Sequence, residues 1–232
     1  MNAIVIPMFN EEKNVIPLVE RIENVLNNRI DCDIVLLNDG SKDGTLERMR
    51  EISGRYNNIK IVSSDVNIGF GKIVKKGIQY CLDIGYDILI FMDGDLTHDP
   101  VEIPKLIDAM DEADMVIGSR YVRGGGMKDM PLNRVLISTL GNIVIKLLLR
   151  LPVLDTTGGY RAVRGIVFKK INLLENSFII QLEEVVAANR AGFRIKEIPI
   201  TVSSRIYGTS KFDLSTKQIM SYLEFSLKNC LK

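Results

Sequence analysis

The stretch Ile88–Pro100, ILIFMDGDLTHDP, decides the fold of this chain. Its first five residues, Ile88–Met92, have the length and composition of a strand buried on both faces, and its final Asp-Pro predicts a helix start. Asp93 and Asp95 therefore lie in a loop at the carboxyl end of a strand, where open α/β sheets bind ligands. Two carboxylates separated by one glycine suit Mg²⁺ or Mn²⁺ shared with phosphates. The alternative is an acidic turn that caps the next helix.

Strands and helices alternate on both sides of this stretch. Short apolar segments without polar alternation recur along the chain, and most are followed by a segment with helical spacing. This order predicts an α/β fold with a parallel sheet covered by helices on both faces. We expect strands at residues 3–6, 34–37, 59–62, 88–92, 115–118 and 195–202, and helices at 11–25, 46–55, 67–82, 103–110, 134–150, 181–191 and 218–231.

Composition narrows the class of protein. The 232 residues are 46% hydrophobic and 25% charged, which is ordinary for one globular domain with an appended C-terminal piece. A net charge of +1 gives no overall field that favours nucleic acid. The three cysteines share no metal-site or redox spacing, which favours reduced thiols in an intracellular protein. The N-terminus lacks the basic and apolar regions of a signal peptide.

One late segment is unusually apolar. Arg134–Arg150, RVLISTLGNIVIKLLLR, has more apolar residues than a single core-facing stripe requires. It is either a buried helix of the domain or an amphipathic helix in a membrane interface, with Lys146 and Arg150 reaching the headgroups. We expect a main domain over residues 1–212, with 134–151 as the candidate interface helix, and a C-terminal amphipathic helix over 213–232.

Four carboxylates follow predicted strands or their loops: Glu11, Asp39, Asp93 and Asp95. Because the carboxyl ends of parallel strands share one edge, these side chains should converge, and they would repel one another without a cation or a hydrogen-bonding ligand. Asp39 and Glu11 suit ribose hydroxyls or base N–H groups. The chain has neither a Walker pattern nor a GxGxxG after its first strand, so phosphates must be held by metal and cations.

Cations and one histidine complete the inventory. Each cation is also compatible with a plain surface charge, although guanidinium groups bind phosphate in two-pronged fashion. His98 is expected to be a neighbour of the helix cap rather than a catalytic base. The cations that lie in or beside loops are Arg120, Arg123, Arg134, Arg161, Arg205 and Lys211.

Six motifs in order resemble the family-2 glycosyltransferases with a GT-A fold, and the last two favour the branch of dolichyl-phosphate or polyprenyl-phosphate mannose synthases. The resemblance covers nearly the whole chain and implies a mostly parallel central sheet flanked by helices, with C-terminal interfacial helices. The motifs are VIPMFNEEKN (5–14), LLNDGSKDGT (36–45), MDGDLTHDP (92–100), GSRYVRGGG (118–126), TGGYRAVR (157–164) and EIPITVSSRIYGTSK (197–211).

The resemblance also implies roles for individual residues. Asn38 and Thr97 depart from the pattern of many relatives, which puts a third metal ligand at Thr97 in doubt. The implied guanosine-binding residues are Pro7, Phe9, Glu11, Leu37 and Asp39. Asp93 and Asp95, with Thr97, would hold the metal and diphosphate, and Gly94 would lie under the nucleotide. Arg120, Arg205 and Lys211 would hold phosphates and Arg134 the lipid phosphate, so that Asp95, Arg120 and Arg134 are the implied catalytic residues.

The implied activity is inverting transfer of mannose from GDP-mannose to dolichyl or polyprenyl phosphate, with Mg²⁺ or Mn²⁺, by an enzyme peripheral on the cytoplasmic face of a membrane. A lipid monophosphate is largely dianionic at neutral pH and needs no general base. A separate membrane-anchoring subunit is compatible with the sequence, and nucleic acid is not an expected partner. The alternatives are transfer from UDP-glucose or another donor to a lipid phosphate or polysaccharide, and a non-catalytic nucleotide-sugar-binding domain.

Overall fold

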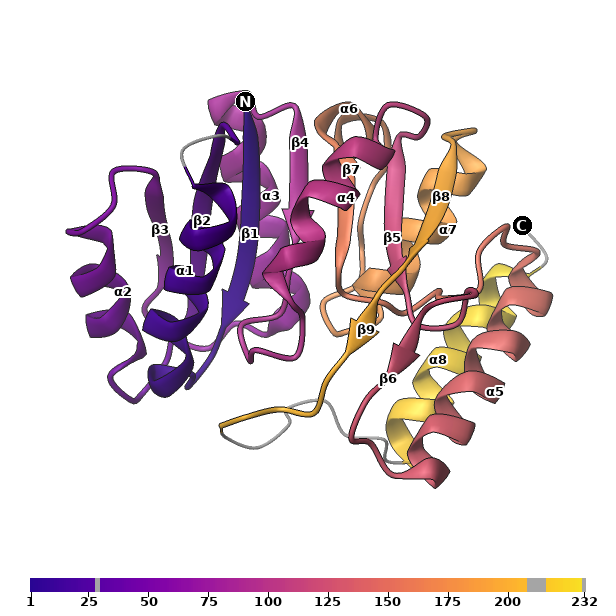
Figure 1. Ribbon diagram of the computed structural model, residues 1–232. Coiled ribbons are helices and arrows are strands. Elements are labelled where there is room, and N and C mark those ends of the chain that lie inside the picture. Colours follow the sequence, from indigo (N-terminus) through magenta and orange to yellow (C-terminus); the bar gives the residue numbers. More distant parts are fainter. Residues whose placement is uncertain (28–29, 208–215, 231–232) are drawn as a thin grey trace.

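The computed structural model describes residues 1–27, 30–207 and 216–230 (Figure 1). The strands are β1 (Asn2–Met8), β2 (Cys32–Asp39), β3 (Ile59–Ser64), β4 (Ile88–Phe91), β5 (Met115–Ser119), β6 (Gly126–Met127), β7 (Arg161–Arg164), β8 (Ile195–Pro199) and β9 (Thr201–Val202). The helices are α1 (Glu12–Leu26), α2 (Thr45–Ser53), α3 (Phe70–Ile84), a 3-10 turn at Pro100–Glu102, α4 (Ile103–Ala109), α5 (Leu132–Leu149), α6 (Gly165–Lys170), α7 (Ile180–Arg190) and α8 (Thr216–Asn229).

Seven strands form the central sheet, in the order β3-β2-β1-β4-β7-β5-β8. Six were expected from their apolar runs, and their neighbouring pairs β3-β2, β2-β1, β1-β4 and β5-β8 are parallel. The sheet is mostly parallel, as expected, and the exception is β7, which lies antiparallel between β4 and β5. The chain returns from α5 at the carboxyl edge of the sheet and can only enter it in the opposite direction. The last expected strand also divides, and β9 pairs with β6 in a separate two-stranded sheet.

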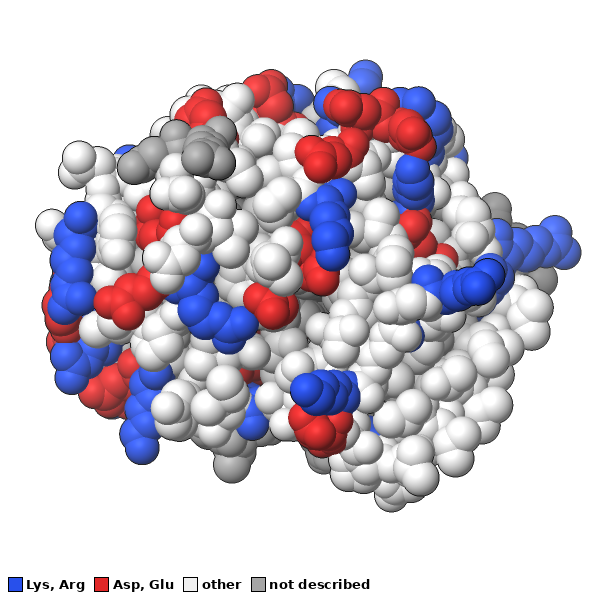
Figure 2. Space-filling model, viewed as in Figure 1, with Lys and Arg blue, Asp and Glu red and all other residues white. Residues whose placement is uncertain are grey.

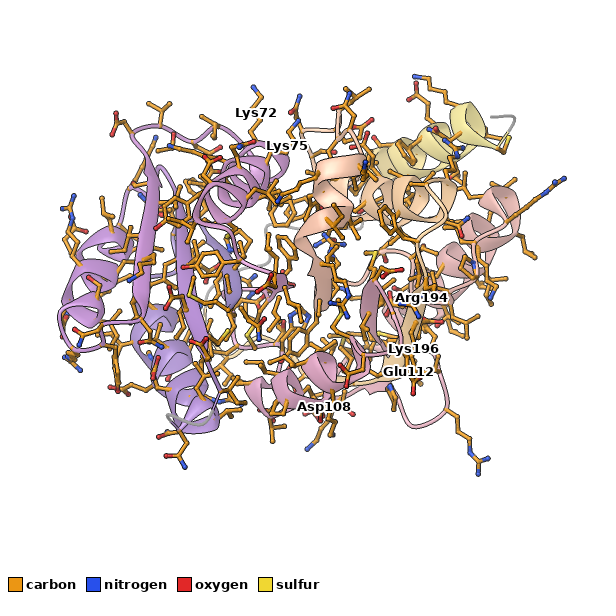
Figure 3. The ribbon with its side chains drawn as sticks, turned by 90° about the horizontal axis from the view of Figure 1, so that it is seen from above. Lys72, Lys75, Asp108, Glu112, Arg194 and Lys196 are labelled. Carbon is orange, nitrogen blue, oxygen red and sulfur yellow. The ribbon has the colours of Figure 1, made fainter. Side chains whose placement is uncertain are left out.

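Helices cover both faces of the sheet. On one face α1, α2 and α4 bury side chains such as Val15, Met49 and Leu106, and on the other face α3, α6, α7 and α8 do the same. Seen from above, Lys72 and Lys75 project from α3 on one side of the molecule, and Asp108 and Glu112 lie on the opposite side (Figure 3). This three-layer arrangement leaves the carboxyl ends of the strands uncovered by either helical layer.

The helix α5 lies outside this sandwich, beside α8 (Figure 1). Of its 18 residues only Asn142 and Ile145 are buried, so the interpretation of this segment as a buried core helix is wrong. By length and composition α5 could cross a membrane, and little of it is buried in the fold. Its exposed apolar side chains are Leu132, Leu136, Ile137, Leu140, Ile143, Val144 and Leu147.

Candidate active site

A pocket of about 580 Å³ lies at the carboxyl edge of the sheet. The loops that follow β1, β2, β4 and β5 contribute to its wall, as the alternation of strands and helices predicts. The turn that precedes β7 also contributes, because an antiparallel strand starts where its parallel neighbours end. Phe91 of β4 pairs with Arg161 of β7, and this register brings Gly159 against the carboxylate of Asp93.

Arg205 connects two acidic sides of this pocket. Its guanidinium donates from Nη1 to Oε1 of Glu11 at 3.0 Å and from Nη2 to Oδ2 of Asp95 at 2.7 Å. The other oxygen of Asp95 accepts hydrogen bonds from the backbone N–H and the hydroxyl of Thr97. Burial raises the pKa of Asp95, but the bonds from Thr97 and the charge of Arg205 outweigh burial and lower the pKa overall. Asp95 is therefore a carboxylate at neutral pH.

Asp93 has a different environment. Its side chain is 39% exposed toward the pocket, but the surrounding protein still removes part of its solvation, and this desolvation raises its pKa. His98 opposes the rise, and Asp95 adds to it. The backbone N–H of Asp93 donates to Nδ1 of His98 at 3.1 Å, and the imidazole stacks on the ring of Tyr160. His98 thus braces the loop, whereas the helix cap is Asp99, which accepts from the N–H of Val101.

The Asp93 and Asp95 carboxylates fit a divalent cation. The raised pKa of Asp93 reflects a negative charge that its protein surroundings do not fully neutralise, and a cation would neutralise it. The Thr97 hydroxyl is already bonded to Asp95. Among the residues that the structure describes, no three acidic, histidine or cysteine side chains gather into a metal cluster. Two carboxylates would therefore leave coordination positions for phosphate oxygens and water, as Mg²⁺ and Mn²⁺ sites commonly do.

Asp39 lines the same pocket as Asp93 and Asp95. Its two oxygens accept the backbone N–H groups of Ile68 and Gly69 at 2.8 and 3.1 Å, which fixes the turn before α3. Burial raises the pKa of Asp39, and these two hydrogen bonds oppose the rise. Each carboxylate oxygen has a second lone pair. Asp39 can therefore hold the turn and still accept a hydrogen bond from a ligand in the pocket.

Arg120 forms a two-pronged ion pair inside the protein. Its Nε and Nη2 donate to the two oxygens of Asp155 at 2.7 and 2.6 Å, and Nη2 also reaches the hydroxyl of Thr157. Asp155 raises the pKa of Arg120 against the effect of burial. Arg120 is also one of the residues that line the pocket. Arg134, at the start of α5, borders the same pocket and forms no ion pair with a described residue.

The remaining part of the pocket is apolar and lies between α5 and α8. Ile137 and Ile145 of α5 face Ile219 and Leu223 of α8 across it. Outside the pocket, the surface over α5 is largely white in Figure 2, without the mixed charges of the rest of the visible face. No acidic residue occurs between Asp129 and Asp155 in the sequence. The site therefore joins an acidic, cation-lined half to an apolar half.

Most residues expected to bind substrate or metal share this pocket. Leu37 does not line it: its side chain is fully buried in the core, against α3 at Gly77. Lys211 lies outside the described residues. The expected residues that line the pocket are Pro7, Phe9, Glu11, Asp39, Asp93, Gly94, Asp95, Thr97, Arg120, Arg134 and Arg205.

Sequence reasoning did not identify several residues of the site. Asp155, which pairs with Arg120, and Asn142, which attaches α5, carry no local pattern that distinguishes them from surface polar residues. Gln181 and Tyr222 also line the pocket, from helices whose sequences suggested only packing. Arg161, expected in a loop, is buried in β7 and pairs with Glu184 at 2.9 Å. The register of distant segments decides all of these contacts.

Comparisons with known proteins give one consistent family. Residues 3–171 match the family model described as glycosyl transferase family 2. The chain is 33% identical to a polyprenol monophosphomannose synthase of Mycolicibacterium smegmatis over 213 residues, which cover 90% of this chain and 79% of the relative. It is 32% identical to an undecaprenyl-phosphate mannosyltransferase of Micrococcus luteus, covering 89% and 85%. It is 33% identical to a dolichol-phosphate mannosyltransferase of Pyrococcus furiosus, covering 95% and 61%.

The fold is also similar to solved structures. A glucosyl-3-phosphoglycerate synthase from Mycobacterium tuberculosis, in complex with Mn²⁺, UDP-glucose and phosphoglyceric acid, superposes with a TM-score of 0.73 and 18% identity. The match covers 99% of this chain and 79% of that protein. At this identity the likeness concerns the fold, which is of the GT-A type expected from the sequence.

Proposed function

This chain belongs to glycosyl transferase family 2 and is a glycosyltransferase, and from this premise we propose that it transfers mannose from GDP-mannose to a polyprenyl or dolichyl phosphate. The observation that carries the proposal is the two-part pocket, in which carboxylates and arginines adjoin an apolar space between α5 and α8. The polar part suits a nucleotide sugar and a phosphate. The apolar part suits the first carbons of a prenyl chain. The names of the relatives support the same activity.

In this proposal the donor lies along the carboxyl edge of the sheet. Glu11 and Asp39 accept hydrogen bonds from the nucleoside, while Pro7, Phe9 and Gly94 form the surface beneath it. The diphosphate lies beside Asp93 and Asp95. Mg²⁺ or Mn²⁺ held by these two carboxylates would neutralise charge on the departing diphosphate.

The acceptor phosphate enters between Arg120 and Arg134. Both residues line the pocket, and two hydrogen bonds to Asp155 orient the guanidinium of Arg120 in advance. A phosphate monoester is largely dianionic at neutral pH and attacks the sugar carbon without a general base. The task of the protein is then to orient this oxyanion behind the carbon, and one displacement gives a β-linked lipid phosphomannose.

We also propose that the exposed face of α5 binds a membrane surface. Leu136, Leu140 and Leu147 are each at least 61% exposed on this face. Lys146 and Arg150 lie at its C-terminal end, where they would meet anionic headgroups. The cytoplasmic face is the proposed side, since Cys32, Cys81 and Cys230 are unpaired. A membrane-anchoring subunit is a further proposed partner, which co-purification from membranes would reveal.

A donor screen tests the function. Purified protein is incubated with one labelled donor at a time: GDP-mannose, GDP-glucose, UDP-glucose or UDP-N-acetylglucosamine. The acceptor is undecaprenyl or dolichyl phosphate in detergent, and each reaction contains EDTA, Mg²⁺ or Mn²⁺. We expect label in the lipid fraction from GDP-mannose only, and only with a metal ion. Incorporation from the UDP-sugars alone would replace the donor assignment. Tight GDP binding without transfer to any acceptor would instead indicate a non-catalytic binding domain.

A further inference from the structure

The helix α5 is attached to the rest of the protein by an unusual buried residue. Only two of its side chains are buried, and one of them is the amide of Asn142. Its Oδ1 accepts the backbone N–H and the hydroxyl of Thr156 at 2.9 and 2.8 Å. Its Nδ2 donates to the Ser138 carbonyl within α5 at 3.0 Å, and it also lies 3.3 Å from the Tyr121 hydroxyl and 3.3 Å from that of Thr157. Both ends of the amide are thus bonded to segments outside α5.

These hydrogen bonds connect Asn142 to Arg120, the cation proposed to hold the acceptor phosphate. The hydroxyl of Thr157 that faces Asn142 also accepts from Nη2 of Arg120 at 3.3 Å. Tyr121, which lies beside Asn142, is bonded to Ser138 one turn earlier in α5 and contacts the guanidinium of Arg120 with its ring. One network of polar contacts therefore joins α5 to the side chain of Arg120.

Helix geometry links Asn142 to the other cation. Arg134, Ser138 and Asn142 are four residues apart in turn, so they share one face of α5, and about 12 Å of helix separates the first from the last. A rotation of α5 by one residue, about 100°, would turn Arg134 away from the pocket. The side chains of α5 and α8 that line the pocket include Ile145 and Leu223, and such apolar side chains do not define one rotation as strictly as directional hydrogen bonds do.

We propose that Asn142 is a positioning residue that fixes the rotation and register of α5 and thereby sets Arg134 opposite Arg120 across the acceptor-phosphate site. The acceptor phosphate in this proposal rests on the proposed function, whereas the role of Asn142 in fixing α5 does not. A buried asparagine in a helix interface commonly specifies register at some cost in stability. Here it would allow α5 to remain exposed on its outer face while the phosphate site stays aligned.

A distance measurement tests the positioning directly. Spin labels at Leu140→Cys on α5 and Arg50→Cys on α2, both exposed, are introduced in a Cys230→Ser background. We expect one narrow distance distribution, which Asn142→Leu broadens or shifts. Ile145→Ala removes the other buried side chain of α5 and serves as the matched control: it lowers the melting temperature and leaves the distribution centred where it was. An unchanged distribution in Asn142→Leu would overturn the proposal.

A double-mutant cycle tests the consequence for the acceptor. In the wild-type protein, Arg134→Ala is expected to lower kcat/KM for polyprenyl phosphate at least about tenfold. In a protein that already carries Asn142→Leu, the same replacement should lower it less than about threefold, although residues this far apart normally behave additively. The KM for the donor should not change, and Asn142→Asp, which keeps the acceptor for Thr156, should lie between. The Arg134/Ile145 cycle should be additive. Additive losses for the Arg134 and Asn142 replacements would refute the proposal. If the wild-type protein transfers no mannose, the proposed function is refuted, and the distance measurement alone decides whether Asn142 positions α5.

Discussion

Arg205 and Asp95, which are 110 residues apart in the chain, form an ion pair of 2.7 Å inside the pocket. The pair ties the segment after β9 to the loop after β4. It also places a fixed positive charge on a carboxylate that the proposed metal ion would share. Arg205 therefore holds the loop in place, and it would also contribute to the electrostatic environment of the proposed metal ion and diphosphate.

Replacing Arg205 with alanine should weaken the donor site. Asp95 and Glu11 would each lose a charge-assisted hydrogen bond, and the diphosphate would lose a neighbouring cation. We expect kcat/KM for the donor to fall roughly 10- to 100-fold, with a smaller fall for Arg205→Lys. Steady-state kinetics over a range of GDP-mannose concentrations would measure this. Equal losses for both variants would argue against a role for the planar guanidinium group.

Asp93→Asn should separate stability from activity. The pKa of Asp93 is raised, so its ionised form is disfavoured in the folded protein, and an uncharged isostere removes that penalty. In EDTA we expect the variant to melt at a higher temperature than the wild type, while metal-dependent transfer is lost. Thermal unfolding and the transfer assay, run on the same preparations, give both values. A lower melting temperature in EDTA would contradict this account of the carboxylate.

Asp155→Asn should destabilise the protein strongly. The side chain of Asp155 is fully buried, and its replacement leaves the guanidinium of Arg120 without its counter-charge. Breaking one side of such a pair costs about 3 kcal/mol or more. Urea unfolding at pH 7 measures the loss. The control is the double variant Arg120→Met with Asp155→Asn, which removes both charges and is expected to recover part of the stability without recovering transfer.

Glu184 should make stability depend on pH. Burial raises its pKa to about 7, although Arg161 opposes the rise. Since the folded pKa exceeds the usual value of 4.5, stability is greatest when Glu184 is protonated and falls as pH increases from 4.5 to 7. Between pH 5 and 7 the unfolding free energy should decrease by about 2 kcal/mol from this group. Urea unfolding at several pH values would show the slope, and Glu184→Gln should flatten it.

Leu140→Glu should weaken membrane binding. Leu140 is 61% exposed on the apolar face of α5, and its replacement puts a charge where acyl chains are expected. We expect binding to anionic vesicles to fall roughly tenfold or more in a sedimentation assay. Val66→Glu is the matched control, since Val66 is 66% exposed before α3. Similar losses for both variants would indicate a general charge effect rather than a docking face on α5.

Much of the candidate site followed from local patterns. The run Ile88–Met92 identified a buried strand, and its position identified Asp93 and Asp95 as residues of a loop at the sheet edge. The same reasoning brought Glu11 and Asp39 to that edge, and the pocket contains all four. These predictions succeeded because hydrophobic periodicity and turn residues act over a few positions, and parallel strands then share a carboxyl edge.

Tertiary structure decided the rest. With four residues, two of them arginines, β7 is too short and too charged to be identified as a strand from sequence. Its antiparallel direction follows from its pairing with β4 and β5. Arg120 lines the pocket with the other expected residues, but its ion pair with Asp155 could be found only from the fold. The apolar composition of Arg134–Arg150 was equally compatible with burial and exposure. Periodicity shows that a helix has an apolar face, but it does not show whether another part of the chain covers that face. Here α8 lies beside α5, and the outer side of α5 stays exposed.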